Sequence, residues 1–181
     1  MTFYTRKGDD GKTGLLGEGR IPKYDLRIET LGALDESNAM LGLARTAVLD
    51  ARGGPLLLES QRDLYQLMAE VAATPEAANQ FHFDARRVQW LEEQINALSK
   101  TVELPKEFIV PGDSPAGAAV SLARTIVRRA ERRVAELFDT KEITNPALQQ
   151  YLNRLSSLLF VLELIENQAA GKATTLTKGK S

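Results

Sequence analysis

Three arginines stand at four-residue intervals in ARTIVRRAERRVAEL, residues 123–137. On an α-helix, Arg124, Arg128 and Arg132 would share one face, where like charges repel one another. A planar guanidinium matches the oxygens of phosphate groups, so the row could bind a triphosphate. An exposed, solvated helix face is the other explanation, and the spacing alone leaves the two about even. Glu131 follows Arg128 by one helical turn and would balance part of its charge.

A glycine-rich arm of mixed charge, YTRKGDDGKTGLLGEGRIPK, occupies residues 4–23. Residues 11–13, GKT, match the end of a phosphate-binding loop, but that motif requires a glycine where Arg6 stands and a buried strand before it. We therefore reject a P-loop. Glycines still allow main-chain amides to surround an anion, whereas composition alone favours a flexible, solvated terminus. Asp9 and Asp10 would either bond to the loop's own amides or lie near a bound Mg²⁺.

Two further polar residues interrupt apolar helical segments. Asp35 follows a leucine in LGALDESNAMLGLA, and a buried carboxylate there would need a cation, for which Arg124 is a candidate. The other possibility is that Asp35 and Glu36 face solvent as a pair. Asn153 stands among leucines in YLNRLSSLLF, where it would either satisfy main-chain groups or contact the edge of a base or ribose.

Composition limits the chemistry that the chain can perform. Its 181 residues are 43% hydrophobic and 26% charged, with a formal net charge of −1, which fits one globular domain. The absence of cysteine rules out disulfides, thiolate ligands and thiol nucleophiles, and one histidine, His82, cannot form a histidine metal cluster. We expect no metal site built by the protein. The start MTFYTRKG has no apolar signal core, and no apolar run could span a bilayer, so a cytoplasmic location without a membrane partner is expected.

Five segments have apolar residues at helical spacing, and no segment alternates convincingly as a strand. Asp84 is expected to cap the third helix, while Ser114-Pro115 and Asn145-Pro146 begin the fourth and fifth. Short connections favour an all-α, up-and-down five-helix bundle. The buried stripe of the fourth helix is expected at Leu122, Ile126, Ala130, Val134 and Leu137. The helices are expected at about residues 24–49, 57–73, 84–100, 115–138 and 146–170.

The chain is therefore expected to form a single domain, residues 1–181, in three parts. These parts are an N-terminal arm over residues 1–23, a helical bundle over 24–170 and a polar, flexible tail over 171–181.

Four segments together resemble the PduO-type ATP:corrinoid adenosyltransferases: YTRKGDDGKTGL, ETLGALDESNAMLGLA, FIVPGDSPAGAAVSLARTIVRRAERRV and NPALQQYLNRLSSLLFVL. The likeness extends from Tyr4 to about Leu162, and the combination is far more specific than any one segment. It implies a ferritin-like five-helix bundle assembled as a homotrimer, with active sites between subunits. It also implies transfer of the 5′-deoxyadenosyl group of ATP to the cobalt of cob(I)alamin, which gives adenosylcobalamin and triphosphate.

The resemblance implies roles for individual residues as well. Arg128, Arg124 and Asp35 match catalytic positions, and Asp35 would pair with Arg124 across a subunit boundary. Phe108 matches the aromatic residue that lies beneath the corrin of cobalamin and displaces its lower axial base. Mg²⁺ is expected with ATP. The positions that match ATP contacts are Thr5, Arg6, Lys7, Gly8, Thr13, Gly14, Lys23, Arg128, Glu131, Arg132 and Asn153.

The chain departs from the family's pattern at three places. Asp113 stands where a second glycine is usual after proline, Glu163 begins the segment ELIE where Ala-Arg-Tyr-Ala is common, and Lys7 replaces a commoner threonine. These departures leave open a non-catalytic helical protein that binds ATP or corrinoid and delivers it to a partner enzyme. The partners implied for an active enzyme are a flavin-type reductase and an adenosylcobalamin-dependent enzyme. Near-zero net charge argues against nucleic-acid binding.

Overall fold

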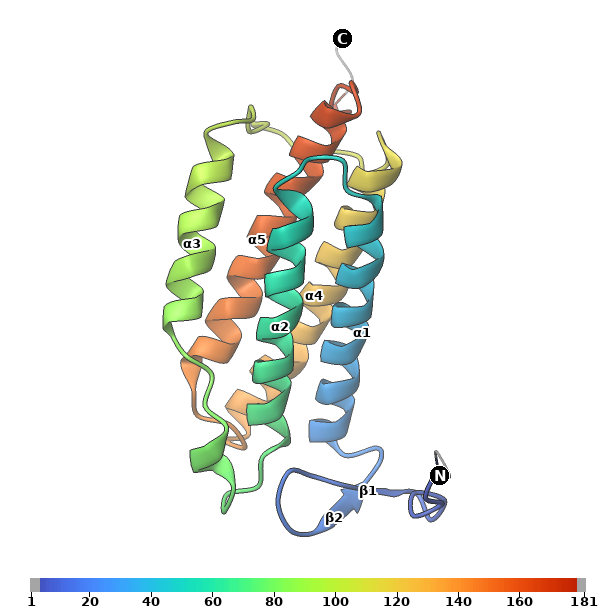
Figure 1. Cartoon of the computed structure of the whole chain (residues 1–181), viewed down its shortest axis with the longest axis vertical. Coiled ribbons are helices and arrows are strands. Elements are labelled where there is room, and N and C mark those ends of the chain that lie inside the picture. The colour runs from blue at the N-terminus through green and yellow to red at the C-terminus, as the bar shows by residue number, and fades with distance from the viewer. Residues whose placement is uncertain (1–3, 179–181) are drawn as a thin grey trace.

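Five antiparallel helices run up and down the long axis of the molecule in the computed structural model, which describes residues 4–178 (Figure 1). The expected all-α bundle is confirmed. Pro146 and Pro115 occupy the first turns of two helices, where a missing N–H costs nothing. The helical elements are α1 (Leu26–Ala47), α2 (Gly53–Ala72), the 3₁₀ turn η1 (Ala78–Gln80), α3 (Arg86–Ser99), α4 (Pro115–Asp139) and α5 (Pro146–Ala169).

Short polar side chains define where the helices begin. The Ser114 hydroxyl accepts from the Gly117 N–H at 2.9 Å, and the Asn145 side chain accepts from the Ala147 N–H at 3.0 Å. Asp84 was expected to be the N-cap of α3, but that position belongs to Ala85, whose side chain makes no capping bond. Asp84 lies one residue earlier, and its carboxylate accepts from the Arg86 N–H at 2.8 Å.

Helix α5 forms the centre of the core, because it packs against α4, α3 and α2. The buried stripe of α4 includes Ala130, Val134 and Leu137, as expected, and Ile126 is half-buried. Leu122 was wrongly placed in that stripe, since 51% of it is exposed. The stripe instead begins with Val120, Ala123 and Val127, which are on the face of α4 that meets α1 and α5.

A buried carboxylate joins three helices within this core. Asp63 of α2 is 2% exposed, and its two oxygens accept from Nε and Nη2 of Arg87, each at 2.7 Å. The Tyr151 hydroxyl of α5 donates to the same carboxylate at 2.7 Å, while the Arg87 guanidinium lies 4.2 Å from the centre of the Trp90 ring. Burial, followed by the charge of Asp63, raises the pKa of Tyr151 well above its usual range. The cluster ties α2, α3 and α5 together.

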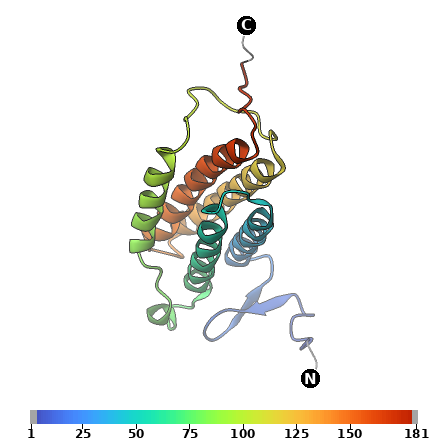
Figure 2. The ribbon, with the colours of Figure 1, turned by 45° about the horizontal axis from the view of Figure 1, so that its top comes forward.

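A short β-hairpin precedes the bundle. The sequence analysis did not predict this hairpin. Strands β1 (Lys12–Gly14) and β2 (Arg20–Pro22) pair antiparallel, with Thr13 opposite Ile21. The arm lies at one end of the bundle, whereas the loop of residues 100–114 arches over the other end beside the C-terminal tail (Figures 1 and 2). None of the helices within residues 4–178 is long and apolar enough to cross a membrane.

Candidate functional site

The N-terminal arm is attached to the end of α2. The Leu16 N–H donates to the Ala72 carbonyl at 2.8 Å, and the Thr74 N–H donates to the Leu16 carbonyl at 2.9 Å. These bonds place the stretch between the two strands against the bundle. The arm from β1 onward therefore has a defined position, in contrast to the free terminus that composition alone favoured.

Arg20 holds the tight turn that precedes the hairpin. Its guanidinium donates to both carboxylate oxygens of Asp10 at 2.8 Å and to the Lys12 carbonyl at 2.9 Å, and it also bonds to the Lys7 carbonyl. The Asp10 carboxylate accepts from the Lys12 N–H at 3.1 Å. The bond from Arg20, then that from Lys12, lowers the pKa of Asp10 below its usual range. Asp10 thus bonds to its own loop, one of the two roles considered for it.

The arm residues that match ATP contacts lie on this exposed turn and its hairpin. The Thr5 hydroxyl accepts from the Lys7 N–H at 3.4 Å. A Cβ added to Gly8 would stand 3.1 Å from Nζ of Lys23, so the Lys23 ammonium lies over the turn. One ammonium group therefore lies beside the main chain of a glycine-containing turn, a place where an anion could bind. The other members of the set are Arg6, Thr13 and Gly14.

The arginines of α4 separate into two groups. Arg128 and Arg132 are exposed, and Nη1 of Arg132 donates to the Arg128 carbonyl at 3.0 Å. By contrast, Arg129 pairs with Glu36 of α1, and Arg133 pairs with Glu136 at 3.1 Å. Within residues 4–178 no carboxylate pairs with Arg128 or Arg132, so their charge is free for an anion.

Helices α4 and α5 meet beside this row through Glu131 and Asn153. The Asn153 amide donates to the Glu131 carboxylate at 2.9 Å and accepts from Nη1 of Arg154 at 2.8 Å. Nε of Arg154 also forms an ion pair with the Glu92 carboxylate of α3 at 2.9 Å. The structure thus brings together two residues that are 22 positions apart in the chain, next to Arg128 and Arg132.

Arg124 and Phe160 lie between two adjoining hollows. One hollow, of about 420 Å³, is also lined by Phe108 and Ile109 of the upper loop. The other, of about 450 Å³, is also lined by Arg128. The aromatic ring of Phe108 and the guanidinium of Arg128 therefore line adjoining hollows. Phe108 itself is 86% exposed, so its ring is free to meet a flat ligand.

Glu163 is a buried carboxylate near Arg124, and sequence reasoning noted it only as a departure from the family. It is fully buried, and neither of its oxygens has a hydrogen-bond partner within the described chain. Burial raises its pKa, which nearby Ser121 and Arg124 partly oppose. Asp35 is exposed on α1, and its carboxylate forms no hydrogen bond or ion pair with any residue from 4 to 178. Its proposed pairing with Arg124 would therefore need another subunit.

Replacing Glu163 with glutamine is expected to remove a pH-dependent loss of stability. Because its pKa is raised on folding, the native protein keeps the proton over a pH range in which the unfolded chain has released it. The free energy of unfolding of the unsubstituted protein should therefore fall as pH rises through this range, and that of Glu163→Gln should fall less. Denaturant unfolding between about pH 4 and pH 8 measures the difference. The expectation would be contradicted if the free energy of unfolding of Glu163→Gln changed with pH in parallel with that of the unsubstituted protein. Glu136→Gln, which changes an exposed glutamate, is the control.

No group of three or more His, Cys, Asp or Glu side chains is placed to hold a metal ion within residues 4–178. In the arm, the Asp10 carboxylate is already paired with Arg20 at 2.8 Å.

The protein is an all-α five-helix bundle with a folded N-terminal arm, and two hollows lie beside the arginines of α4. The chain belongs to the cobalamin adenosyltransferase family, whose sequence model matches residues 3–166. It is 38% identical over 176 residues to a corrinoid adenosyltransferase of Bacillus subtilis, covering 94% of this chain and 89% of that protein.

Further comparisons give the same family. The chain is 36% identical over 178 residues to the corrinoid adenosyltransferase PduO of Salmonella typhimurium, covering 97% of this chain but only 53% of that longer protein. A variant PduO-type ATP:corrinoid adenosyltransferase from Lactobacillus reuteri, solved in complex with cobalamin and ATP, superimposes with a TM-score of 0.88. That structure is 28% identical and covers 98% of this chain and all of its own.

Proposed function

We propose that this chain transfers the 5′-deoxyadenosyl group of ATP to the cobalt of a reduced corrinoid. The observation that supports this most is the pair of adjoining hollows that share Arg124, one beside Phe108 and the other beside Arg128. A flat, apolar corrin and a triphosphate chain need these two environments side by side. Family membership and the ligands named for the Lactobacillus reuteri structure support the same substrates.

The reaction needs positioning more than acid–base chemistry. Co(I) is itself a strong nucleophile: its electron pair forms the Co–C bond to C5′, the C5′–O bond breaks, and the triphosphate leaves with the bonding electrons. No proton has to be removed from the attacking atom. The protein has to align C5′ with cobalt and stabilise the leaving anion.

The arginine row and the arm turn would share the task of binding triphosphate. No carboxylate between residues 4 and 178 pairs with the guanidinium groups of Arg128 and Arg132, and Lys7 and Lys23 offer ammonium groups at the turn. Mg²⁺ would accompany the nucleotide, since phosphate oxygens and water supply most of its ligands in such sites. Glu131 and Asn153, already bonded to each other, would contact the nucleoside.

The active form is proposed to be a homotrimer with sites between subunits. The arm lies at the opposite end of the bundle from the loop that carries Phe108 (Figure 1). One arm therefore does not reach the corrin hollow of its own chain, although the arm of a neighbour could. Exposed Leu43 and Leu122, and unpaired Asp35, would be covered at such an interface.

The chemistry implies partners and a location. A flavin-type reductase would supply electrons to reach Co(I), and an adenosylcobalamin-dependent enzyme would take the product. Both would act in the cytoplasm, which is the location proposed for this chain from its lack of an apolar signal core at the start MTFYTRKG and of an apolar run that could span a bilayer.

The proposal is tested by the phosphate product. Attack at C5′ releases inorganic triphosphate intact, one for each corrinoid alkylated. Detection of pyrophosphate and phosphate as the primary products, or of nucleotide consumption without corrinoid, would argue for a different reaction.

Phe108→Ala is expected to slow the reduction of Co(II) much more than the alkylation of preformed Co(I). Phe108 would exclude the lower axial ligand, and four-coordinate Co(II) is easier to reduce than five-coordinate Co(II). Single-turnover rates measured from Co(II) with reductant and from chemically prepared Co(I) separate the two steps. Equal losses in both would contradict the assigned role. The control is Tyr65→Ala, which removes an exposed aromatic side chain from α2.

A further inference from the structure

The C-terminal tail pairs with the loop that carries Phe108. The Val110 N–H donates to the Thr175 carbonyl at 2.8 Å, and the Thr177 N–H donates to the Phe108 carbonyl at 2.9 Å. Ile109 and Leu176 face each other in this short antiparallel bridge. The tail was expected to be flexible, but up to Lys178 it has a defined place, and residues 179–181 lie outside the described chain. So short a pairing is marginal without further support.

Asp113 supplies that support through both of its carboxylate oxygens. Oδ2 accepts from the Thr175 N–H at 2.9 Å, and Oδ1 accepts from the Thr175 hydroxyl at 2.6 Å. These two bonds, the one from the hydroxyl first, lower the pKa of Asp113 below its usual range. A glycine, which the family resemblance led us to expect at this position, could make neither bond.

Asp113 is itself held at a fixed point. Its neighbour Ser114 is 3% exposed, caps α4, and donates its hydroxyl to the Asn167 side chain of α5 at 2.7 Å. The two bonds from Thr175 to Asp113 therefore connect the tail to the start of α4 rather than to another loop.

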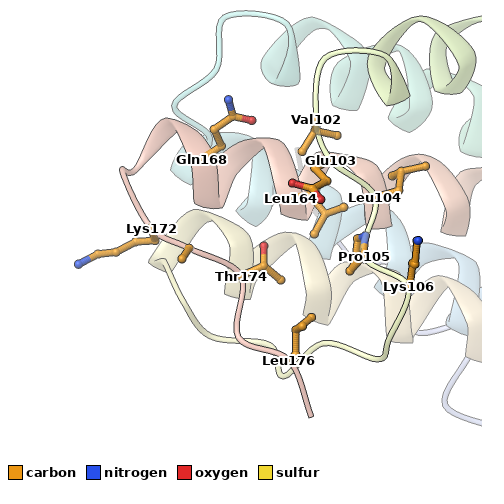
Figure 3. A pocket seen from close by; sticks show the side chains of 11 residues that line it. Val102, Glu103, Leu104, Pro105, Lys106, Leu164, Gln168, Lys172, Thr174 and Leu176 are labelled. Atoms are coloured by element: carbon orange, nitrogen blue, oxygen red, sulfur yellow. The ribbon is translucent and has the colours of Figure 1, made fainter. Parts of the chain in front are cut away.

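The loop and the tail enclose a third hollow, of about 610 Å³, against the end of α5 (Figure 3). Leu104 and Pro105 of the loop, Leu164 of α5, and Leu176 of the tail form its apolar lining. Pro105 also lines the two hollows beside Arg124. A displacement of the tail would therefore open the space behind the wall of the proposed corrin site.

We propose that Asp113 is a positioning residue for the reaction, which latches the C-terminal segment of residues 172–178 across the loop and so holds Phe108 against the corrin. This inference rests on the proposed function. Phe108 is mostly exposed, so neighbouring side chains do little to fix its ring, and its main-chain bond to the tail sets its position. A wall that displaces an axial ligand must stay in place while the ligand competes for the same space.

The test compares two variants. Asp113→Ala loses both acceptor oxygens. Asp113→Asn keeps a carbonyl oxygen that can accept from the Thr175 N–H, and its amide can donate to the Thr175 hydroxyl. Two quantities are measured with ATP bound: hydrogen exchange of the Val110 and Thr177 amides, and the fraction of Co(II) cobalamin with the four-coordinate electron paramagnetic resonance signature. Asp113→Ala should exchange these amides at least about tenfold faster and lose most of the four-coordinate fraction, and Asp113→Asn should restore both. Alkylation of preformed Co(I) should stay nearly unchanged.

Two results would overturn the inference. One is a normal four-coordinate fraction in Asp113→Ala, whether or not its amides exchange faster; the other is a failure of Asp113→Asn to restore what alanine removes. Thermal unfolding of each variant, compared with the exposed-carboxylate control Asp139→Ala, shows that the bundle is intact. Failure of the proposed function is distinct, because the unsubstituted protein would then form neither the four-coordinate species nor a Co–C bond.

Discussion

Replacing Arg128 with alanine is expected to lower kcat about 10²- to 10³-fold, equal to about 2.7–4 kcal/mol of transition-state stabilisation. Arg128 lines the hollow that it shares with Arg124, and no carboxylate within residues 4–178 pairs with its guanidinium. Negative charge on the triphosphate grows as the C5′–O bond breaks, so the loss should appear mainly in kcat. ATP should still bind, because the arm turn and Arg132 remain.

Steady-state kinetics at saturating corrinoid, with ATP varied, separate kcat from KM. Arg128→Lys keeps the charge but not the planar fork, so its loss should be smaller than that of alanine. The matched control is Arg62→Ala, which removes an exposed guanidinium paired with Glu59 on α2, away from the hollows. A kcat within twofold of the unsubstituted enzyme for Arg128→Ala would contradict its assignment to the leaving triphosphate.

The largest loss of stability is expected for Asp63→Ala, at about 3–5 kcal/mol. The substitution leaves the buried end of Arg87 without its two bonds and the Tyr151 hydroxyl without its acceptor. Three helices lose their common contact at once. Urea unfolding followed by helical circular dichroism measures the change in the free energy of unfolding.

Two control variants distinguish the buried cluster from ordinary ion pairs. Tyr151→Phe keeps the Arg87–Asp63 pair and should cost only about 1–2 kcal/mol. Glu92→Ala breaks the more exposed pair with Arg154 and should cost less than about 1 kcal/mol. If Asp63→Ala cost no more than Glu92→Ala, the cluster would not have the structural role that its geometry indicates.

Local signals in the sequence predicted most helix positions. Ser114-Pro115 and Asn145-Pro146 start α4 and α5 as expected, because a cap and a proline act within one turn. The start of α2 was placed too late, at about residue 57, because glycines are poor helix formers and residues 53 and 54 are both glycine. Gly53 instead begins α2, and a Cβ there would stand 3.0 Å from Oε1 of Glu166. That close approach depends on α5, which local sequence does not reveal.

The parts that sequence reasoning missed depend on contacts between distant residues. Strands of three residues, as in β1 and β2, are too short to show alternation. The position of the tail depends on Asp113 and Thr175, which are 62 residues apart. Likewise, the burial of Glu163 near Arg124 follows from the packing of α5 on α4.

The candidate site was predicted in part. Spacing alone placed Arg124, Arg128 and Arg132 on one face, but it did not distinguish a phosphate site from an exposed charged surface. The structure adds the hollows beside the row and the bond between Glu131 and Asn153, neither of which follows from spacing. The pairing of Asp35 with Arg124 stays a prediction, because it needs a second chain.

The most direct measurement of the central claim is formation of a cobalt–carbon bond by the purified protein. Incubation with ATP, Mg²⁺ and chemically reduced cobalamin should yield a light-sensitive alkylcobalamin in catalytic amounts, and Arg128→Ala should be strongly impaired in the same assay. Binding of ATP and cobalamin with no such bond formed would contradict adenosyl transfer and would favour a protein that only binds and delivers its ligands.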